Sequence, residues 1–258
     1  MTIQVVIPMA GEGTRFRKAG FSTDKPLLPV GNYRMFEIVV ANVLSPAVSS
    51  VVLVSRQEWN LRSAVRDLAS RIHCDIHLIE VESTTDGPAS TVELAGPLID
   101  PDLPLVTANS DQFVDAHIDG FYDEIQTGDS DGVILTMQTR DPKWSFARLD
   151  ESGRVVEVRE KVPISSHATV GIYGFKTGSS FFAGLSRMKE RNDRTNGEFY
   201  IAPVYNHLIR DGLLVSVQDL GPVSRVMYGL GTPEDYTHFL STEAAKAATD
   251  LAKEQFAC

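Results

Sequence analysis

The sequence is poor in cysteine and in long apolar runs. Its 258 residues include 2 cysteines, Cys74 and Cys258, with no Cys-x-x-Cys pair and no histidine cluster at zinc-ligand spacing. These absences argue against a disulfide framework and a zinc site, and they favour a reducing compartment. A membrane span would need about 18 consecutive apolar residues, and a secretory signal would begin with a basic segment. Neither occurs, so we expect a soluble, cytoplasmic protein without a membrane partner.

Positive charge is also in deficit. Lys and Arg number 24 against 34 Asp and Glu, which gives a net charge of −10. A protein of this charge has no diffuse positive field to attract a nucleic acid backbone. Any phosphate that it binds must therefore be held by local groups.

Apolar segments of strand length alternate with segments of helical period as far as about residue 130. Buried strands joined by helices predict βαβ units and a parallel sheet that is covered on both faces. Beyond this point GVILTMQ, FARLD, RVVEVRE and TVGIYGF predict further strands of a mixed sheet. Pro8 is expected to end the first strand, and the stretch from Pro233 onward is expected to form a C-terminal helix. One continuous α/β domain over residues 1–258 is predicted.

The loop PMAGEGTRF, which follows the first predicted strand, carries the clearest chemical signal. A dinucleotide-binding GxGxxG motif would need a third glycine at Phe16, and its second strand would end in an acid rather than in Ser55. A GxxxxGK[ST] phosphate loop is absent as well. Gly11 and Gly13 remain suited to letting backbone N–H groups approach a phosphate chain without a Cβ atom in the way.

GEGTRF, followed about ten residues later by KPLLPVG, resembles the G-x-G-T-R…K-P motif of the sugar-1-phosphate nucleotidyltransferases, also called nucleotide-sugar pyrophosphorylases. The resemblance runs from residue 5 to 236 and continues through STTDGPAST, NSDQ, VREKV, VGIYGF, NGEFYIAPVYN and GLGTPEDY. It implies a Rossmann-like, three-layer α/β fold with a mixed, mostly parallel sheet of the GT-A-like nucleotidyltransferase type. Residues of about 1–115 would form the nucleotide-binding half, and about 116–258 the sugar-phosphate-binding half with the C-terminal helix.

The implied reaction transfers a nucleoside monophosphate from a nucleoside triphosphate to a sugar 1-phosphate, forms a nucleotide sugar and releases pyrophosphate, with Mg²⁺ as cofactor. A phosphate monoester has its second pKa near about 6, so the nucleophile is already mostly ionised at neutral pH. No strong base is therefore needed, which agrees with a motif of cations and a carboxylate.

The same resemblance implies the roles of individual residues. Arg15 would contact the β- and γ-phosphates, Lys25 the α-phosphate, and Asp111 would hold Mg²⁺. The nucleotide-binding residues would be Ala10, Gly11, Glu12, Gly13, Thr14, Glu82 and Gly87. The sugar-phosphate-binding residues would be Trp144, Ser145, Glu160, Lys161, Gly171, Glu198 and Tyr200, with Lys161 on the acceptor phosphate and Glu160 on sugar hydroxyls.

Several alternatives stay open at the level of sequence. Many relatives have a second acidic or amide metal ligand at the position of Gly229, so Asp111 acts either with phosphates and water alone or with Asp219 or Asp235. The carboxylate of Glu82 only accepts hydrogen bonds, which favours GTP or CTP over UTP or dTTP. The rival functions are a GT-A-type glycosyltransferase and a non-catalytic relative that binds nucleotide sugars. The sugar, its pathway and the question of a homo-oligomer are left undecided.

Overall fold

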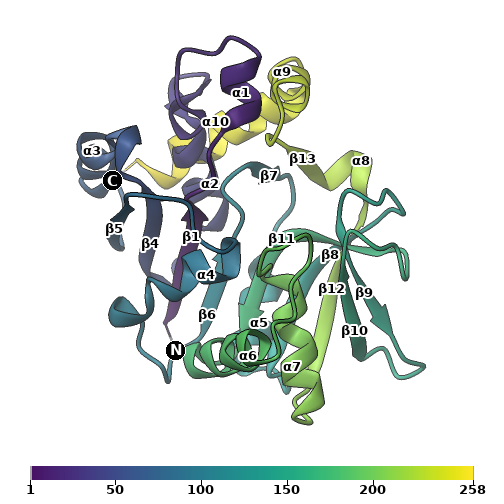
Figure 1. Cartoon of the computed structure of the whole chain (residues 1–258). Helices are drawn as coiled ribbons and strands as arrows, with labels where there is room; N and C mark the ends of the chain where they lie inside the picture. Colours follow the sequence, from purple (N-terminus) through teal and green to yellow (C-terminus); the bar gives the residue numbers. More distant parts are fainter. Residues whose placement is uncertain (1, 258) are drawn as a thin grey trace.

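A nine-stranded sheet organises residues 2–257, the part of the chain that the computed structural model describes (Figure 1). Its strands are β1 (Ile3–Met9), β4 (Val48–Arg56), β5 (Asp75–Val81), β6 (Leu105–Ala108), β8 (Gly132–Gln138), β9 (Ser145–Leu149), β10 (Val155–Glu160), β11 (His167–Phe175) and β12 (Val215–Pro222). Two small antiparallel pairs accompany it, β2 (Pro29–Val30) with β3 (Tyr33–Arg34), and β7 (Gln112–Val114) with β13 (Met227–Gly229).

The directions of the strands confirm the predicted mixed, mostly parallel sheet. The strands pair in the order β10-β9-β11-β6-β1-β4-β5, and β8 joins β11 to β12. β6, β1, β4 and β5 are parallel neighbours, whereas β11 is antiparallel to β6, β8 and β9. Within the described sheet, β10 and β11 are thus the two strands that run against the rest.

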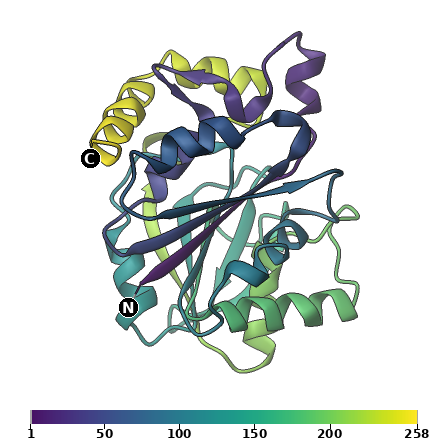
Figure 2. The same ribbon diagram turned by 90° about the vertical axis from the view of Figure 1, so that its left-hand side faces the viewer.

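Alternate side chains of the buried strands face two different helical layers, as the period of two in a strand requires. On β1, Val5 and Ile7 belong to one apolar cluster and Val6 to the other. The first cluster packs against α2 (Met35–Val43), α3 (Arg62–Ala69), α5 (Asp119–Thr127), α9 (Pro233–Leu240) and α10 (Glu243–Gln255). The second packs against α4 (Pro88–Glu93), α6 (Gly178–Glu190) and α7 (Tyr205–Arg210). The expected three layers are therefore present, and in Figure 2 the sheet separates the yellow C-terminal helices from the green α6 and α7.

Short helices and turns complete the chain. They are α1 (Thr14–Lys18), α8 (Val223–Val226) and four 3₁₀ turns, η1 (Lys25–Leu27), η2 (Gln57–Trp59), η3 (Gly96–Leu98) and η4 (Ala202–Val204). No helix in residues 2–257 has the length and hydrophobicity that crossing a bilayer requires.

Two expectations from the sequence are corrected. β1 does not end at Pro8, because Pro8 and Met9 continue in register with β4. The N–H of Gln4 points to the β6 side, so the missing N–H of Pro8 falls on that side too, where pairing with β6 has already ended at Val6. The C-terminal stretch forms two helices rather than one, since Thr242 adopts an extended conformation between α9 and α10.

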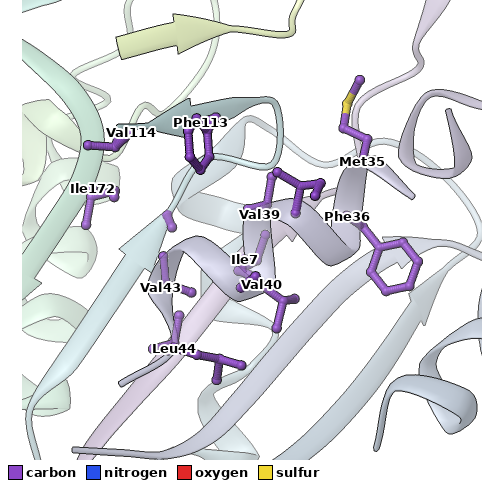
Figure 3. Packing of buried hydrophobic residues seen from close by; sticks show 14 of the residues in the cluster. Ile7, Met35, Phe36, Val39, Val40, Val43, Leu44, Phe113, Val114 and Ile172 are labelled. Carbon is purple, nitrogen blue, oxygen red and sulfur yellow. The ribbon is translucent and has the colours of Figure 1, made fainter. Parts of the chain in front are cut away.

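α2 is buried along its whole length; it packs against the sheet and α10, and Phe113 and Val114 of β7 lie beside it (Figure 3). Its Asn42 is a polar residue in this apolar layer, and its amide bonds both backbone groups of Val114. Nδ2 donates to the Val114 carbonyl at 2.8 Å, and Oδ1 accepts from the Val114 N–H at 2.7 Å. Asn42 thus acts as a strand partner for β7, the segment that directly follows Asp111.

Asn42→Ala should therefore lower the free energy of unfolding by about 2–4 kcal/mol, because it leaves two buried backbone groups without partners. Urea unfolding followed by circular dichroism measures this loss. Asn32→Ala, in the exposed β2–β3 turn, is the matched control and should change the midpoint little. Equal midpoints for the two variants would contradict the structural role of Asn42.

Candidate functional site

The main cavity opens at the edge of the sheet where its parallel strands end. β1 and β6 both run toward this edge, and loops 10–13 and 109–111 leave from it. Open α/β sheets commonly bind ligands at this position. The cavity has a volume of about 760 Å³, and its lining includes these predicted residues: Ala10, Gly11, Glu12, Gly13, Thr14, Arg15, Lys25, Gly87, Asp111, Trp144, Ser145, Glu160, Gly171, Glu198 and Tyr200. Segments far apart in the sequence therefore meet at one site.

The glycine loop owes its shape to Gly13 and Phe16. Gly13 has a left-handed backbone with φ of +63°, which a glycine adopts without strain. Phe16 stands at the position of the third glycine. Its ring is buried, with edge contacts to Phe21 at 5.3 Å and to Tyr236 at 6.0 Å between ring centres. These contacts fix α1 against the protein. The neighbouring Arg15 stays exposed and lines the cavity.

Lys25 and Asp111 are brought into direct contact although 86 residues separate them. The Lys25 ammonium donates to Asp111 Oδ2 at 2.6 Å. The side chains are 17% and 34% exposed, so the pair is partly screened by solvent. Arg15 and Lys25 thus bring two cations into the cavity, with the Asp111 carboxylate beside Lys25.

Asp111 is held by the backbone around it. Its carbonyl accepts from the N–H of Leu230 at 2.7 Å, and a Cβ atom at Gly231 would lie 3.0 Å from Oδ2. Within residues 2–257, no group of three or more His, Cys, Asp or Glu side chains could hold a metal ion. Mg²⁺ is commonly bound by one or two carboxylates together with substrate phosphates. Asp111 therefore fits a Mg²⁺ ion that arrives with a phosphate chain.

The two candidate partners of Asp111 differ in position. Asp235 Oδ2 lies 3.9 Å from the point where a Cβ atom of residue 229 would be. Asp219 instead lies on β12, where it accepts hydrogen bonds from Gln138 and from the N–H of Gly221. Asp235 is thus the acid that lies beside Gly229.

Another part of the cavity wall comes from the strands β9, β10 and β11. The Ser145 hydroxyl donates to Glu160, and both side chains line the cavity. Burial raises the pKa of the Glu160 carboxyl, although the Ser145 hydrogen bond and the charge of Lys161 act in the other direction.

Lys161 does not line the cavity but supports a residue that does. Its ammonium donates to the Tyr200 hydroxyl at 3.0 Å and lies 4.8 Å from the centre of the same ring. Burial acts to lower the pKa of Lys161, but the Tyr200 hydrogen bond and the charges of Glu160 and Glu198 outweigh it and raise the pKa. Lys161 is therefore a protonated cation behind the cavity wall.

Glu82 is likewise outside the lining, and it is exposed. Its segment reaches the cavity only further along, through Thr84, Thr85 and Gly87. The position of Glu82 therefore does not support the expected preference for GTP or CTP, which depended on contact between this residue and the nucleotide base.

Several lining residues were not named from the sequence, among them Thr84, Thr85, Asn109, Thr169 and Tyr173. Four of these five lie in the quoted segments STTDGPAST, NSDQ and VGIYGF. The strand pattern offered a further signal for two of them. Gly171 was expected in the site, and side chains two positions apart on a strand share a face, so Thr169 and Tyr173 could have been inferred from it. The Thr169 and Tyr173 hydroxyls lie 2.9 Å apart.

The raised pKa of Glu160 leads to a prediction about stability. An acid whose pKa is higher in the folded protein than in the unfolded protein lowers the free energy of unfolding once it ionises. This loss begins as the pH rises past the pKa of the unfolded state, about 4.3, and is complete above the pKa of the folded state. Glu160→Gln should therefore raise the melting temperature near pH 7, and the gain should shrink below about pH 4. Calorimetry over this pH range provides the measurement.

Glu157 on the same strand is the matched control, because its pKa is shifted in the opposite direction. Hydrogen bonds from Arg159 and Arg148 lower its pKa, so its ionised form favours the folded state. Glu157→Gln should lower the melting temperature slightly at neutral pH. If Glu160→Gln also lowered it, the assignment of Glu160 as a desolvated acid would be wrong.

Comparison with known proteins agrees with this geometry. A sequence profile of the family described as nucleotidyl transferase matches residues 4–207. The glucose-1-phosphate thymidylyltransferase of Streptomyces antibioticus is 27% identical over 215 residues, which are 81% of this chain and 58% of that protein. The chain thus spans less than two thirds of the length of this relative.

Solved structures are similar over most of the chain. A nucleoside-diphosphate-sugar pyrophosphorylase from Vibrio cholerae RC9 is 28% identical with a TM-score of 0.78, covering 92% of this chain and 100% of that one. The inositol-1-phosphate CTP transferase of T. maritima has a TM-score of 0.76 at 16% identity, covering 100% and 98%, and so supports the fold alone. Because the family profile matches most of the sequence, including the glycine loop, Lys25 and Asp111, the chain belongs to the nucleotidyl transferase family.

Proposed function

We propose that this protein is an enzyme that transfers a nucleoside monophosphate from a nucleoside triphosphate to a sugar 1-phosphate. The observation that carries the proposal is the meeting of Arg15, Lys25 and Asp111 in one cavity. The names of the similar proteins from S. antibioticus and V. cholerae, a thymidylyltransferase and a pyrophosphorylase, support the same reaction class.

In the proposed reaction, an oxygen of the acceptor phosphate attacks the α-phosphorus of the triphosphate. The bond from this phosphorus to the oxygen that bridges to the β-phosphorus breaks, and pyrophosphate leaves with the electron pair. Arg15 stabilises the charge that develops on the leaving group, and Lys25 neutralises the α-phosphate. When bound, Mg²⁺ supplies further neutralisation of phosphate charge, with Asp111 as its protein ligand.

On the acceptor side, we assign Glu160 and Glu198 to the sugar hydroxyls. Carboxylate oxygens accept hydrogen bonds, and both side chains line the cavity. Lys161, which the resemblance assigns to the acceptor phosphate, does not itself line the cavity, and we propose that it acts there through its hydrogen bond of 3.0 Å to the Tyr200 hydroxyl. We further propose that the enzyme acts in the cytoplasm, where it supplies a nucleotide sugar for a polysaccharide or a small glycosylated metabolite.

Pyrophosphate release tests the proposal. ATP, GTP, CTP, UTP and dTTP are each mixed with Mg²⁺ and a series of sugar 1-phosphates. At least one pair should release pyrophosphate and form the nucleotide sugar in equal amounts. Release of free nucleotide from a nucleotide sugar would instead indicate a glycosyltransferase, and binding without turnover a non-catalytic relative.

A further inference from the structure

Two loops that approach the cavity from different parts of the chain are joined to each other. We call residues 82–88 the base loop and residues 191–201 the acceptor loop. The Phe199 N–H donates to the Asp86 carbonyl at 2.8 Å, and the Ala89 N–H donates to the Phe199 carbonyl at 3.0 Å. A Cβ atom at Gly87 would lie 2.7 Å from both backbone groups of Phe199. Contact this close requires the glycine.

The acceptor loop is itself a tight hairpin. Thr195 and Glu198 exchange two backbone hydrogen bonds of 3.0 Å each. Asn196 and Gly197 between them both have positive φ, 51° and 86°, as the residues of a type I′ turn do. The hairpin leads directly into Glu198 and Tyr200, which line the cavity.

Every nitrogen of the Arg194 guanidinium group donates a hydrogen bond, and one of these bonds connects the hairpin to the base loop. Nε donates to Asn192 Oδ1 at 2.8 Å and Nη1 to the Gly197 carbonyl at 2.8 Å, both within the acceptor loop. Nη2 donates to Asp86 Oδ2 at 2.9 Å, across to the base loop. The guanidinium also lies 4.0 Å from the centre of the buried Phe199 ring.

We propose that Arg194 is a positioning residue that couples the two substrates. It fixes the positions of Glu198 and Tyr200 relative to the base loop. A bound nucleotide that orders the base loop therefore also orders the acceptor loop. A second ligand then binds to a loop that is already restrained, which raises its affinity. The proposal rests on the proposed function, together with the expected role of Gly87 in nucleotide binding and the assignment of Glu198 to the sugar.

Arginine suits the role of residue 194 better than lysine does. Lysine offers a point charge on a flexible stem and cannot match three acceptors in fixed directions. Asp86 is 66% exposed and Arg194 31%, so the ion pair alone contributes modestly. The expected effects are therefore a few-fold change in coupling rather than a loss of the fold.

Hydrogen exchange of the backbone amides, measured by mass spectrometry without Mg²⁺, provides a test that does not depend on turnover. Each of the five triphosphates is added to the wild-type protein and to Arg194→Gln. In the wild type, the triphosphate that protects residues 10–15 should also slow exchange in residues 195–200. In Arg194→Gln, residues 10–15 should stay protected while the slowing of exchange in residues 195–200 becomes a few-fold smaller than in the wild type.

Kinetics give the second readout. Arg194→Gln, Arg194→Lys and Asp86→Asn should each raise KM for the sugar 1-phosphate about three- to fivefold, the range of an exposed ion pair, with kcat and KM for the triphosphate little changed. Asp86→Arg combined with Arg194→Asp should recover part of the loss. Arg187→Gln, which breaks an exposed ion pair with Asp211 outside both loops, is the matched control and should change none of these values.

The outcomes separate the two proposals. If no triphosphate protects residues 10–15, the proposed function fails. If residues 10–15 are protected and residues 195–200 respond equally in the wild type and Arg194→Gln, the coupling role of Arg194 is overturned while the function stands.

Discussion

Lys25→Ala should lower kcat/KM for pyrophosphate release about 100-fold, the effect typical of removing one preorganised charge contact from a transition state. Two consequences act in the same direction. The variant loses the ammonium that would neutralise the α-phosphate, and it leaves Asp111 without the partner that lies 2.6 Å away. An unpaired carboxylate in the cavity then repels the incoming phosphates. Steady-state kinetics with the best substrate pair measures the loss.

A double variant separates these two consequences. Lys25→Ala combined with Asp111→Asn removes the repelling charge as well, so it should bind the triphosphate more tightly than Lys25→Ala alone, as measured by calorimetry without Mg²⁺. Turnover should not recover. Lys18→Ala, at the exposed end of α1, is the matched control and should keep the wild-type rate. A Lys25→Ala enzyme of unchanged rate would remove this residue from the mechanism.

Asp111→Asn is expected to have a comparable effect through the metal. The amide keeps the size of the side chain and an oxygen that can accept from Lys25, but it loses the charge that a hard cation requires. We expect kcat to fall about 100-fold and the rate to respond much less to Mg²⁺. Binding of Mn²⁺ in the presence of a triphosphate, followed by electron paramagnetic resonance, should weaken in parallel.

Asp115→Asn provides the control for this measurement, because Asp115 is an exposed carboxylate four residues further along the chain. It should bind Mn²⁺ as the wild type does. If Asp111→Asn kept the wild-type Mn²⁺ affinity and Mg²⁺ response, Asp111 would not be the ligand, and Asp235 beside Gly229 would become the first acid to substitute.

The local parts of the site could be predicted from the sequence. Gly11, Gly13, Arg15 and Lys25 lie within 15 residues of one another, and their order after an apolar strand carries the information. The sheet was predictable for the same reason, since continuous apolar runs and helical periods are local properties. Asp111 followed from its position just beyond the buried strand β6.

Contacts between distant segments could not be predicted in this way. Arg194 and Asp86 are 108 residues apart, and each reads in the sequence as an ordinary surface charge. Glu82 shows the converse failure. It directly follows β5, yet the chain turns so that Thr84 and Thr85 reach the cavity instead. The direction of a side chain in a loop depends on tertiary contacts, and the periodicity of apolar residues in the sequence does not indicate these contacts.

A crystal structure of the protein with a bound nucleoside triphosphate tests the central claim most directly. We expect the phosphate chain to lie along residues 10–15, with Arg15 and Lys25 at hydrogen-bonding distance, about 2.7–3.2 Å, from its oxygens. A nucleotide bound elsewhere, with both cations directed into solvent, would contradict the account.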